Sequence, residues 1–170
     1  MKKIPVIILA GFLGSGKTTT LNHILRSSNG KKIGVIVNDF GEVNIDSLLV
    51  SRQTDNTMEL SGGCICCQMN DSGLDEILAT FSHPNSKIDA IVIEASGIAE
   101  PIDLRKLILY SSNKSISMNG VVYIVDAKNI IDNLKNHPKI NNHIAAADII
   151  VLNKIDLVDK NDLASIKSTI

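Results

Sequence analysis

Three cysteines lie within four positions of the sequence, and they are the only cysteines in the chain: Cys64, Cys66 and Cys67. Three thiolates this close together can bind one soft or borderline cation such as Zn²⁺, and they leave its fourth tetrahedral position open. An open position suits a metal that is handed on to another molecule. Two other interpretations are a redox pair, which would need a strained short disulfide ring, and a buried apolar turn. We expect metal binding, with zinc ahead of cobalt or nickel.

The segment "GFLGSGKT" at residues 11–18 fits the phosphate-binding pattern G-x-x-x-x-G-K-[ST] and follows a predicted strand. Its glycines allow backbone N–H groups to converge on phosphate oxygens at the start of a helix. Lys17 can reach the terminal phosphates as a cation, and the Thr18 hydroxyl is placed to bind Mg²⁺. The residues expected to hold the nucleotide phosphates are Gly11, Gly14, Ser15, Gly16, Lys17, Thr18 and Thr19.

The segment "NKID" at residues 153–156 indicates which base the nucleotide carries. It ends the last predicted strand, where ligands meet an open parallel sheet. The Asp156 carboxylate can accept hydrogen bonds from the N1–H and the exocyclic amine of guanine, whereas adenine offers no matching pair of donors. Asn153 can contact the purine edge, and the stem of Lys154 can lie on the ring. Together with the phosphate loop, these residues predict GTP and GDP as ligands.

Two other predicted strands end in an acidic residue. Glu94 closes the apolar run "IVIE", so we expect it near Mg²⁺ or the attacking water. Gly97, three residues later, can direct its N–H toward the γ-phosphate. We therefore assign catalytic roles to Lys17, Glu94 and Gly97. Asp126 closes "VVYIVD", and we interpret it as a polar residue at the end of the sheet.

The segment "NDFGEVNID" at residues 38–46 contains three carboxylates and a glycine. A loop of this composition can respond to the γ-phosphate and its Mg²⁺. Within it, Asp39 is a candidate Mg²⁺ ligand. A solvated loop without a function is the alternative interpretation.

Apolar runs alternate with amphipathic segments along the chain, and this alternation positions the motifs. The predicted strands are residues 4–10, 32–38, 87–97, 119–127 and 148–156. The predicted helices are residues 17–28, 71–81, 100–110, 141–147 and 160–170, whereas 39–56 is loop-like with a helical turn near 45–50. Strands that alternate with helices imply a mostly parallel sheet with helices on both faces, the α/β fold of P-loop NTPases. We expect one domain over residues 1–170, cut short after its last helix.

The composition argues against several classes of function. The chain has 170 residues, a net charge of −1 and 3% aromatic residues, which favours neither a basic surface nor stacking platforms for nucleic acid. The start "MKKIPVIILAGFLG" imitates a signal peptide, but its apolar run is short and continues directly into the phosphate loop. No segment approaches the roughly 18 apolar residues of a membrane span. We therefore expect a cytoplasmic protein with reduced thiols and no nucleic-acid or membrane partner.

The motifs "GFLGSGKTT", "NDFGEVNID", "GGCICCQ", "IEASGIAEP" and "LNKID", in this order and spacing, resemble those of the CobW-type GTPases, relatives of HypB and UreG. The resemblance covers essentially the whole chain, and the C-x-C-C motif is its most diagnostic part. It implies a GTP-hydrolysing metallochaperone that delivers a metal, often zinc, to a client metalloprotein or to cofactor assembly. It also implies a C-terminal domain after the GTPase domain, and we expect this chain to lack that domain.

The sequence departs from this family at one position, because many members carry an acid where Val37 stands. A metal site here would lack that carboxylate, whereas Glu42 is retained, and the resemblance implies that it is a candidate ligand of the transferred metal. The only arginines are Arg26, Arg52 and Arg105, and none lies in a motif. We therefore predict slow intrinsic hydrolysis that a partner, a homodimer or metal accelerates. Two alternatives are a different P-loop phosphotransferase, which leaves "NKID" and the cysteines unexplained, and a non-catalytic metal-buffering scaffold.

Overall fold

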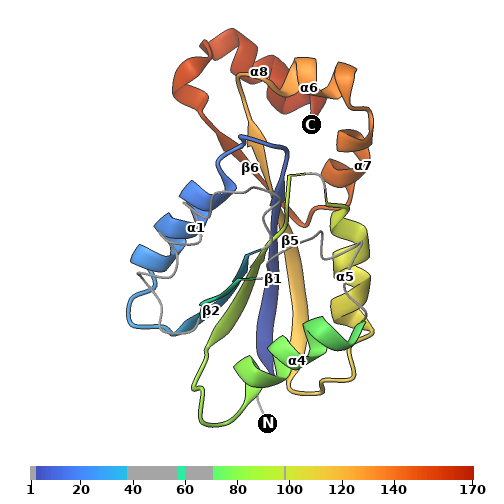
Figure 1. The fold of residues 1–170 in the computed structure, drawn as a ribbon. Helices are drawn as coiled ribbons and strands as arrows, with labels where there is room; N and C mark the ends of the chain where they lie inside the picture. The colour runs from blue at the N-terminus through green and yellow to red at the C-terminus, as the bar shows by residue number, and fades with distance from the viewer. Residues whose placement is uncertain (1–2, 38–56, 60–70, 98) are drawn as a thin grey trace.

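The computed structural model describes residues 3–37, 57–59, 71–97 and 99–170 (Figure 1). Its strands are β1 Ile4–Gly11, β2 Ile33–Val37, β3 Thr57–Glu59, β4 Ala90–Glu94, β5 Ile116–Asp126 and β6 Ile149–Asn153. Its helices are α1 Lys17–Arg26, α4 Asp71–Ser82, α5 Pro101–Leu109, α6 Ile130–Asn136, α7 Lys139–Ala145 and α8 Lys160–Thr169, with a 3₁₀ turn η1 at Ile155–Leu157. The longer strands are rich in Ile and Val, which favour strands that are buried on both faces.

The described strands form one six-stranded sheet in the order β3-β2-β4-β1-β5-β6. Every neighbouring pair in this sheet is parallel. From β1 the chain crosses through α1 toward β2, whereas from β4 it crosses through α5 to β5 on the other side of β1. This change of direction creates a crevice at the carboxyl ends of β1 and β4, which is where open parallel sheets bind ligands.

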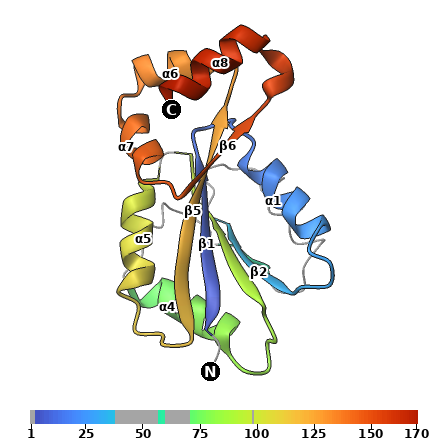
Figure 2. The same cartoon turned by 180° about the vertical axis from the view of Figure 1, so that it is seen from behind.

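Helices cover both faces of the sheet, with α1 on one side and α5 on the other (Figures 1 and 2). On the first face, Leu21 and Leu25 of α1 pack with Leu9 of β1 and Val35 of β2 in one buried cluster. The helices of the second face join a larger cluster through Leu78, Leu104, Ile130, Ile140 and Ile166. The sheet is therefore held rigidly from both sides, and its carboxyl edge is a fixed platform for the loops that follow each strand.

The α/β fold with a mostly parallel sheet is confirmed. The sequence prediction missed α6, whose seven residues "IIDNLKN" are largely polar, and β3, which has three residues. The last strand ends at Asn153, earlier than predicted, because Lys154 has a left-handed backbone with a φ of 57°. The predicted helical turn near 45–50 lies outside the described residues. Among the helices that the structure describes, none is long and apolar enough to cross a bilayer.

Candidate nucleotide-binding site

The loop between β1 and α1 needs glycine at two positions, because neighbouring atoms leave no room for a side chain. Gly11 has a φ of 154°, and a Cβ atom there would lie 2.5 Å from the carbonyl oxygen of Ile124 on β5. Gly16 has a φ of 97°, and a Cβ atom there would lie 2.3 Å from Nδ2 of Asn153 at the end of β6. These two glycines let the phosphate loop curl tightly against the ends of two other strands.

Lys17, the first residue of α1, turns its side chain back into this loop. Its Nζ donates hydrogen bonds to the carbonyl oxygens of Gly11 at 3.1 Å and Phe12 at 3.4 Å. Lys17 is only 9% exposed. A buried ammonium group beside the N-terminus of a helix makes the loop a site for anions. This position fits the predicted role of Lys17 as a phosphate-binding cation.

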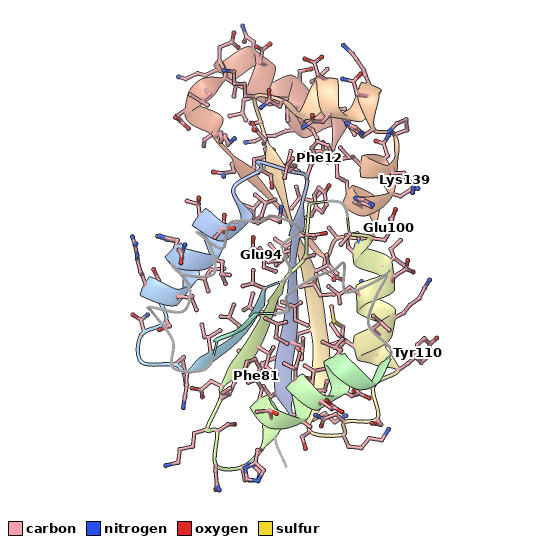
Figure 3. The ribbon with its side chains drawn as sticks, viewed as in Figure 1. Phe12, Phe81, Glu94, Glu100, Tyr110 and Lys139 are labelled. Carbon is pink, nitrogen blue, oxygen red and sulfur yellow. The ribbon has the colours of Figure 1, made fainter. Side chains whose placement is uncertain are left out.

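Thr18 and Glu94 join α1 to the carboxyl end of β4. The Thr18 hydroxyl donates a 2.7 Å hydrogen bond to Oε1 of Glu94. Glu94 is buried, with 5% of its surface exposed, and lies near the centre of the molecule (Figure 3). A hydroxyl and a carboxylate are hard oxygen ligands of the kind that Mg²⁺ prefers. The pair therefore fits a magnesium ion bound beside the phosphates of a nucleotide.

A cavity of about 360 Å³ opens in front of the phosphate loop. The predicted site residues that line it are Gly14, Gly16, Lys17, Thr18, Thr19, Glu94 and Gly97. Gly97 packs closely against the loop, because a Cβ atom there would lie 2.9 Å from the backbone nitrogen of Leu13. Val37 also lines the cavity, from the end of β2. Segments far apart in the sequence thus surround one space in which a triphosphate could bind.

Ser96 lines the same cavity and was not predicted as a site residue. It is buried, and its hydroxyl has no hydrogen-bond partner among the residues that the structure describes. A buried hydroxyl without a partner is costly, so a ligand oxygen is a natural acceptor for it. The signal in the sequence is slight, since Ser96 is one of two small residues between Glu94 and Gly97.

The end of β6 is bonded directly to the phosphate loop. Nδ2 of Asn153 donates to the carbonyl oxygen of Ser15 at 2.8 Å, across 138 positions of sequence. Nζ of Lys154 donates to the carbonyl oxygen of Gly14, also at 2.8 Å. Asp156 lies in η1 and is exposed to solvent, so its carboxylate is accessible to a base. The predicted base-binding segment and the predicted phosphate loop therefore form a single connected site.

Asp126 at the end of β5 belongs to this site as well. Oδ2 of Asp126 lies 2.8 Å from Nζ of Lys154, so the acid forms an ion pair with the base-binding segment. The interpretation of Asp126 as a polar residue at the end of the sheet describes its position but misses this contact. The contact could have been anticipated from an acid at the end of the strand that lies next to the strand with the Asn-Lys sequence.

The segment after Gly97 is anchored to α7. Oε2 of Glu100 lies 2.7 Å from Nε2 of His143, and Oε1 accepts a hydrogen bond from Nζ of Lys139 at 3.2 Å (Figure 3). The hydrogen bond with His143 is the largest influence on the pKa of Glu100, which lies below its usual value, although burial acts in the opposite direction. These contacts hold the start of α5 in place and thereby limit how far Gly97 can move.

Five predicted metal ligands lie outside the described residues: Asp39, Glu42, Cys64, Cys66 and Cys67. Within the described ranges, no group of three or more His, Cys, Asp or Glu side chains could hold a metal ion. The roles of the five residues therefore stay predictions from the sequence.

A parallel sheet, a phosphate loop with its lysine at the start of the first helix, and an Asn-Lys-x-Asp segment bonded to that loop together define a P-loop protein of the GTPase class. The sequence model of the CobW/HypB/UreG nucleotide-binding domain matches residues 5–170. The chain belongs to this family, as its motifs indicated.

Known proteins of this family resemble the chain over nearly all of its length. Zinc-regulated GTPase metalloprotein activator 1 of Dictyostelium discoideum is 32% identical over 99% of this chain and 43% of its own length. Zinc chaperone YjiA of Escherichia coli (strain K12) is 35% identical over 92% of this chain and 51% of its own. The crystal structure of Zn(II)-bound YjiA GTPase from E. coli has a TM-score of 0.72 at 28% identity, over 98% of this chain and 54% of that one. The chain thus spans about half the length of these relatives.

Proposed function

We propose that this chain binds GTP with Mg²⁺, hydrolyses the GTP slowly, and couples the nucleotide to the binding and delivery of a divalent metal, with zinc as the first candidate. The observation that carries the nucleotide part is the pair of hydrogen bonds from Asn153 and Lys154 to the phosphate loop. Residues that read a guanine base and residues that hold phosphates are thereby fixed relative to each other, as one bound nucleotide requires.

The proposed roles follow from where the side chains lie. Lys17 and the N–H groups of the loop would hold the phosphates, and the N–H of Gly97, which lines the same cavity, would donate to the γ-phosphate. Thr18 would hold Mg²⁺ with Glu94 beside it, and the bound ion would neutralise charge that develops on the phosphates. Asp156 accepts hydrogen bonds from the guanine edge.

Slow hydrolysis is proposed because no arginine lines the cavity among the described residues. Arg105 forms an ion pair with Asp148, with 3.3 Å between Nη1 and Oδ2, beside Val121 in the middle of β5. It is not among the residues that line the cavity. An arginine supplied in trans accelerates many GTPases by roughly 10³ to 10⁵. A partner, a second copy of the chain or bound metal would have to supply a comparable effect here.

The metal part of the proposal rests on the C-x-C-C sequence and on the family. Two relatives are named as zinc chaperones or zinc-regulated activators. We propose Cys64, Cys66 and Cys67 as ligands of the transferred metal, with Glu42 nearby and cobalt or nickel as alternatives to zinc. A client metalloprotein would receive the metal, in the cytoplasm, where thiols stay reduced.

Replacement of one carboxylate tests the base assignment. Xanthine carries an oxygen where guanine carries its exocyclic amine, so the amide of Asp156→Asn should favour xanthine over guanine nucleotides. We expect wild type to prefer GDP over XDP and ADP by at least about tenfold, and the variant to reverse the preference between GDP and XDP. Asp162→Asn, which removes an exposed carboxylate from α8, is the matched control. Equal binding of ADP and GDP by wild type would instead support another P-loop phosphotransferase.

Zinc affinity in three nucleotide states tests the metal assignment. Chelator competition would be measured with nucleotide-free, GDP-bound and GTP-analogue-bound protein, with Cys66→Ser alongside. The proposal expects an affinity that changes with the nucleotide and is lost in Cys66→Ser. Equal zinc affinity in all states would contradict the coupling. Phosphate release by wild type but not by Lys17→Ala would distinguish a GTPase from a non-catalytic scaffold.

A further inference from the structure

Two neighbouring strands end in polar residues at the same edge of the sheet. Asp126 ends β5 and Asn153 ends β6, and the register of the sheet pairs these two residues. Asp126 is only 6% exposed. A carboxylate this deeply buried requires a cation or several hydrogen bonds to offset the loss of water. The groups that bind the Asp126 carboxylate therefore indicate its role.

Three groups donate hydrogen bonds to the Asp126 carboxylate. Nζ of Lys154 and Nδ2 of Asn129 both donate to Oδ2 at 2.8 Å. The backbone N–H of Lys128 donates to Oδ1 at 3.0 Å. Burial alone would raise the pKa of Asp126, but these hydrogen bonds outweigh burial and hold the pKa below its usual value. The carboxylate is therefore negatively charged at neutral pH.

The ammonium group of Lys154 connects Asp126 to the phosphate loop. The same Nζ that binds Asp126 also donates to the carbonyl oxygen of Gly14 at 2.8 Å. Lys154 has a φ of 57°, a left-handed backbone that is unfavourable for a residue other than glycine. The contacts of its side chain help to stabilise this backbone conformation. Asp126 provides the contact with a charged group.

We propose that Asp126 is a positioning residue for guanine-nucleotide binding. Its charge holds the Lys154 ammonium group against the phosphate loop, so that the stem of Lys154 lies where the purine ring binds. Asp126 touches neither base nor phosphate in this assignment, and it acts only through Lys154. The inference rests on the proposed binding of GTP and GDP.

A purely local role for Asp126 makes a different prediction. Its hydrogen bonds to Lys128 and Asn129 also shape the turn before α6. If that turn were its whole role, replacement of Asp126 would change the stability of the protein, and any effect on nucleotide binding would not depend on Lys154. A double-mutant cycle separates the two roles, because it measures whether one residue acts through the other.

The experiment measures the dissociation constant of a fluorescent GDP for wild type, Asp126→Asn, Lys154→Met and the double variant. Asp126→Asn is expected to weaken binding at least about tenfold, because a charge-assisted hydrogen bond becomes a neutral one. In the Lys154→Met background the same change should have less than about a twofold effect. Asp148→Asn is the matched control, since Asp148 also pairs with a cation, Arg105, but lies beside Val121 in the middle of β5 rather than at its end.

Two results would overturn the assignment. One is GDP affinity in Asp126→Asn equal to that of wild type, and the other is an equal loss of affinity with and without Lys154. Failure of wild type to bind GDP would contradict the proposed function instead. Thermal unfolding without nucleotide monitors folding of each variant. If Asp126→Asn does not fold, Asp126→Ser takes its place in the same cycle, because it also removes the charge that holds Lys154 and should weaken GDP binding only when Lys154 is present.

Discussion

Replacement of Gly16 by alanine should destabilise the protein even without nucleotide. At its φ of 97°, any residue with a Cβ atom carries a backbone cost of about 1–2 kcal/mol. The new Cβ atom would also lie 2.3 Å from Nδ2 of Asn153. Asn153 would then have to move and lose its hydrogen bond to Ser15, at a further cost of about 0.5–1.5 kcal/mol. The expected total is about 1.5–3.5 kcal/mol.

Gly14→Ala provides the matched comparison. Gly14 has a φ of 71°, so it carries the same kind of backbone cost, but a Cβ atom there would have no neighbour within 4 Å. For a protein of this size, 1 kcal/mol shifts Tm by about 2–4 °C. We therefore expect thermal unfolding of the nucleotide-free protein to show a Tm loss of about 3–14 °C for Gly16→Ala and about 2–8 °C for Gly14→Ala.

The variant Asn153→Ala identifies the source of the difference. Once Asn153 is shortened, the Cβ atom of Gly16→Ala meets no obstacle, so the combined loss of stability should be smaller than the sum of the two separate losses. Equal Tm losses for Gly14→Ala and Gly16→Ala, together with additive losses in the double variant, would refute the contact between the phosphate loop and β6.

Three further changes test other parts of the structure. Tyr123→Phe should stabilise the protein by about 1 kcal/mol at neutral pH, because the Tyr123 hydroxyl is buried with no hydrogen-bond partner in the described part of the chain. Burial raises the pKa of Tyr123 from 10.0 to about 12. The free energy of unfolding of wild type should therefore fall as pH rises from about 10 to about 12, because only the unfolded state loses the tyrosine proton there. Urea unfolding should show no such fall for Tyr123→Phe. Thr18→Val should weaken GTP-analogue binding about tenfold in Mg²⁺ and leave Mg²⁺-free GDP binding little changed, whereas an equal loss in both titrations would refute the magnesium role. Leu78→Ala, at a fully buried position, should lower the free energy of unfolding by about 2–5 kcal/mol without changing GDP affinity.

Local patterns in the sequence were sufficient to predict the phosphate loop and the five longer strands, but not the three-residue β3. A strand such as β1 is a continuous apolar run, and the glycine-lysine pattern that follows it constrains eight adjacent positions. Glu94 could be anticipated in the same way, because an acid directly after an apolar strand must lie at the carboxyl edge of a parallel sheet. In each case the residues that matter are close together in the chain.

Contacts that depend on the order of strands in the sheet could not be predicted from local sequence patterns. Asp126 and Lys154 meet only because β5 and β6 are neighbours, and nothing in either strand's own pattern specifies its neighbour. The pair formed by Glu100 and His143 depends likewise on how α7 packs beside α5. Side-chain partners of this kind follow from tertiary structure, whereas periodicity reports only on one element at a time.

The bonds from Asn153 and Lys154 to the phosphate loop also have a consequence for biosynthesis. The loop emerges from the ribosome early, but the side chains that fix its shape are made 138 and 140 positions later. The phosphate loop of a growing chain stays without these partners until β6 has been made and has joined the sheet. If the chain binds GTP or GDP as proposed, tight binding would therefore mark a chain whose translation has passed residue 154.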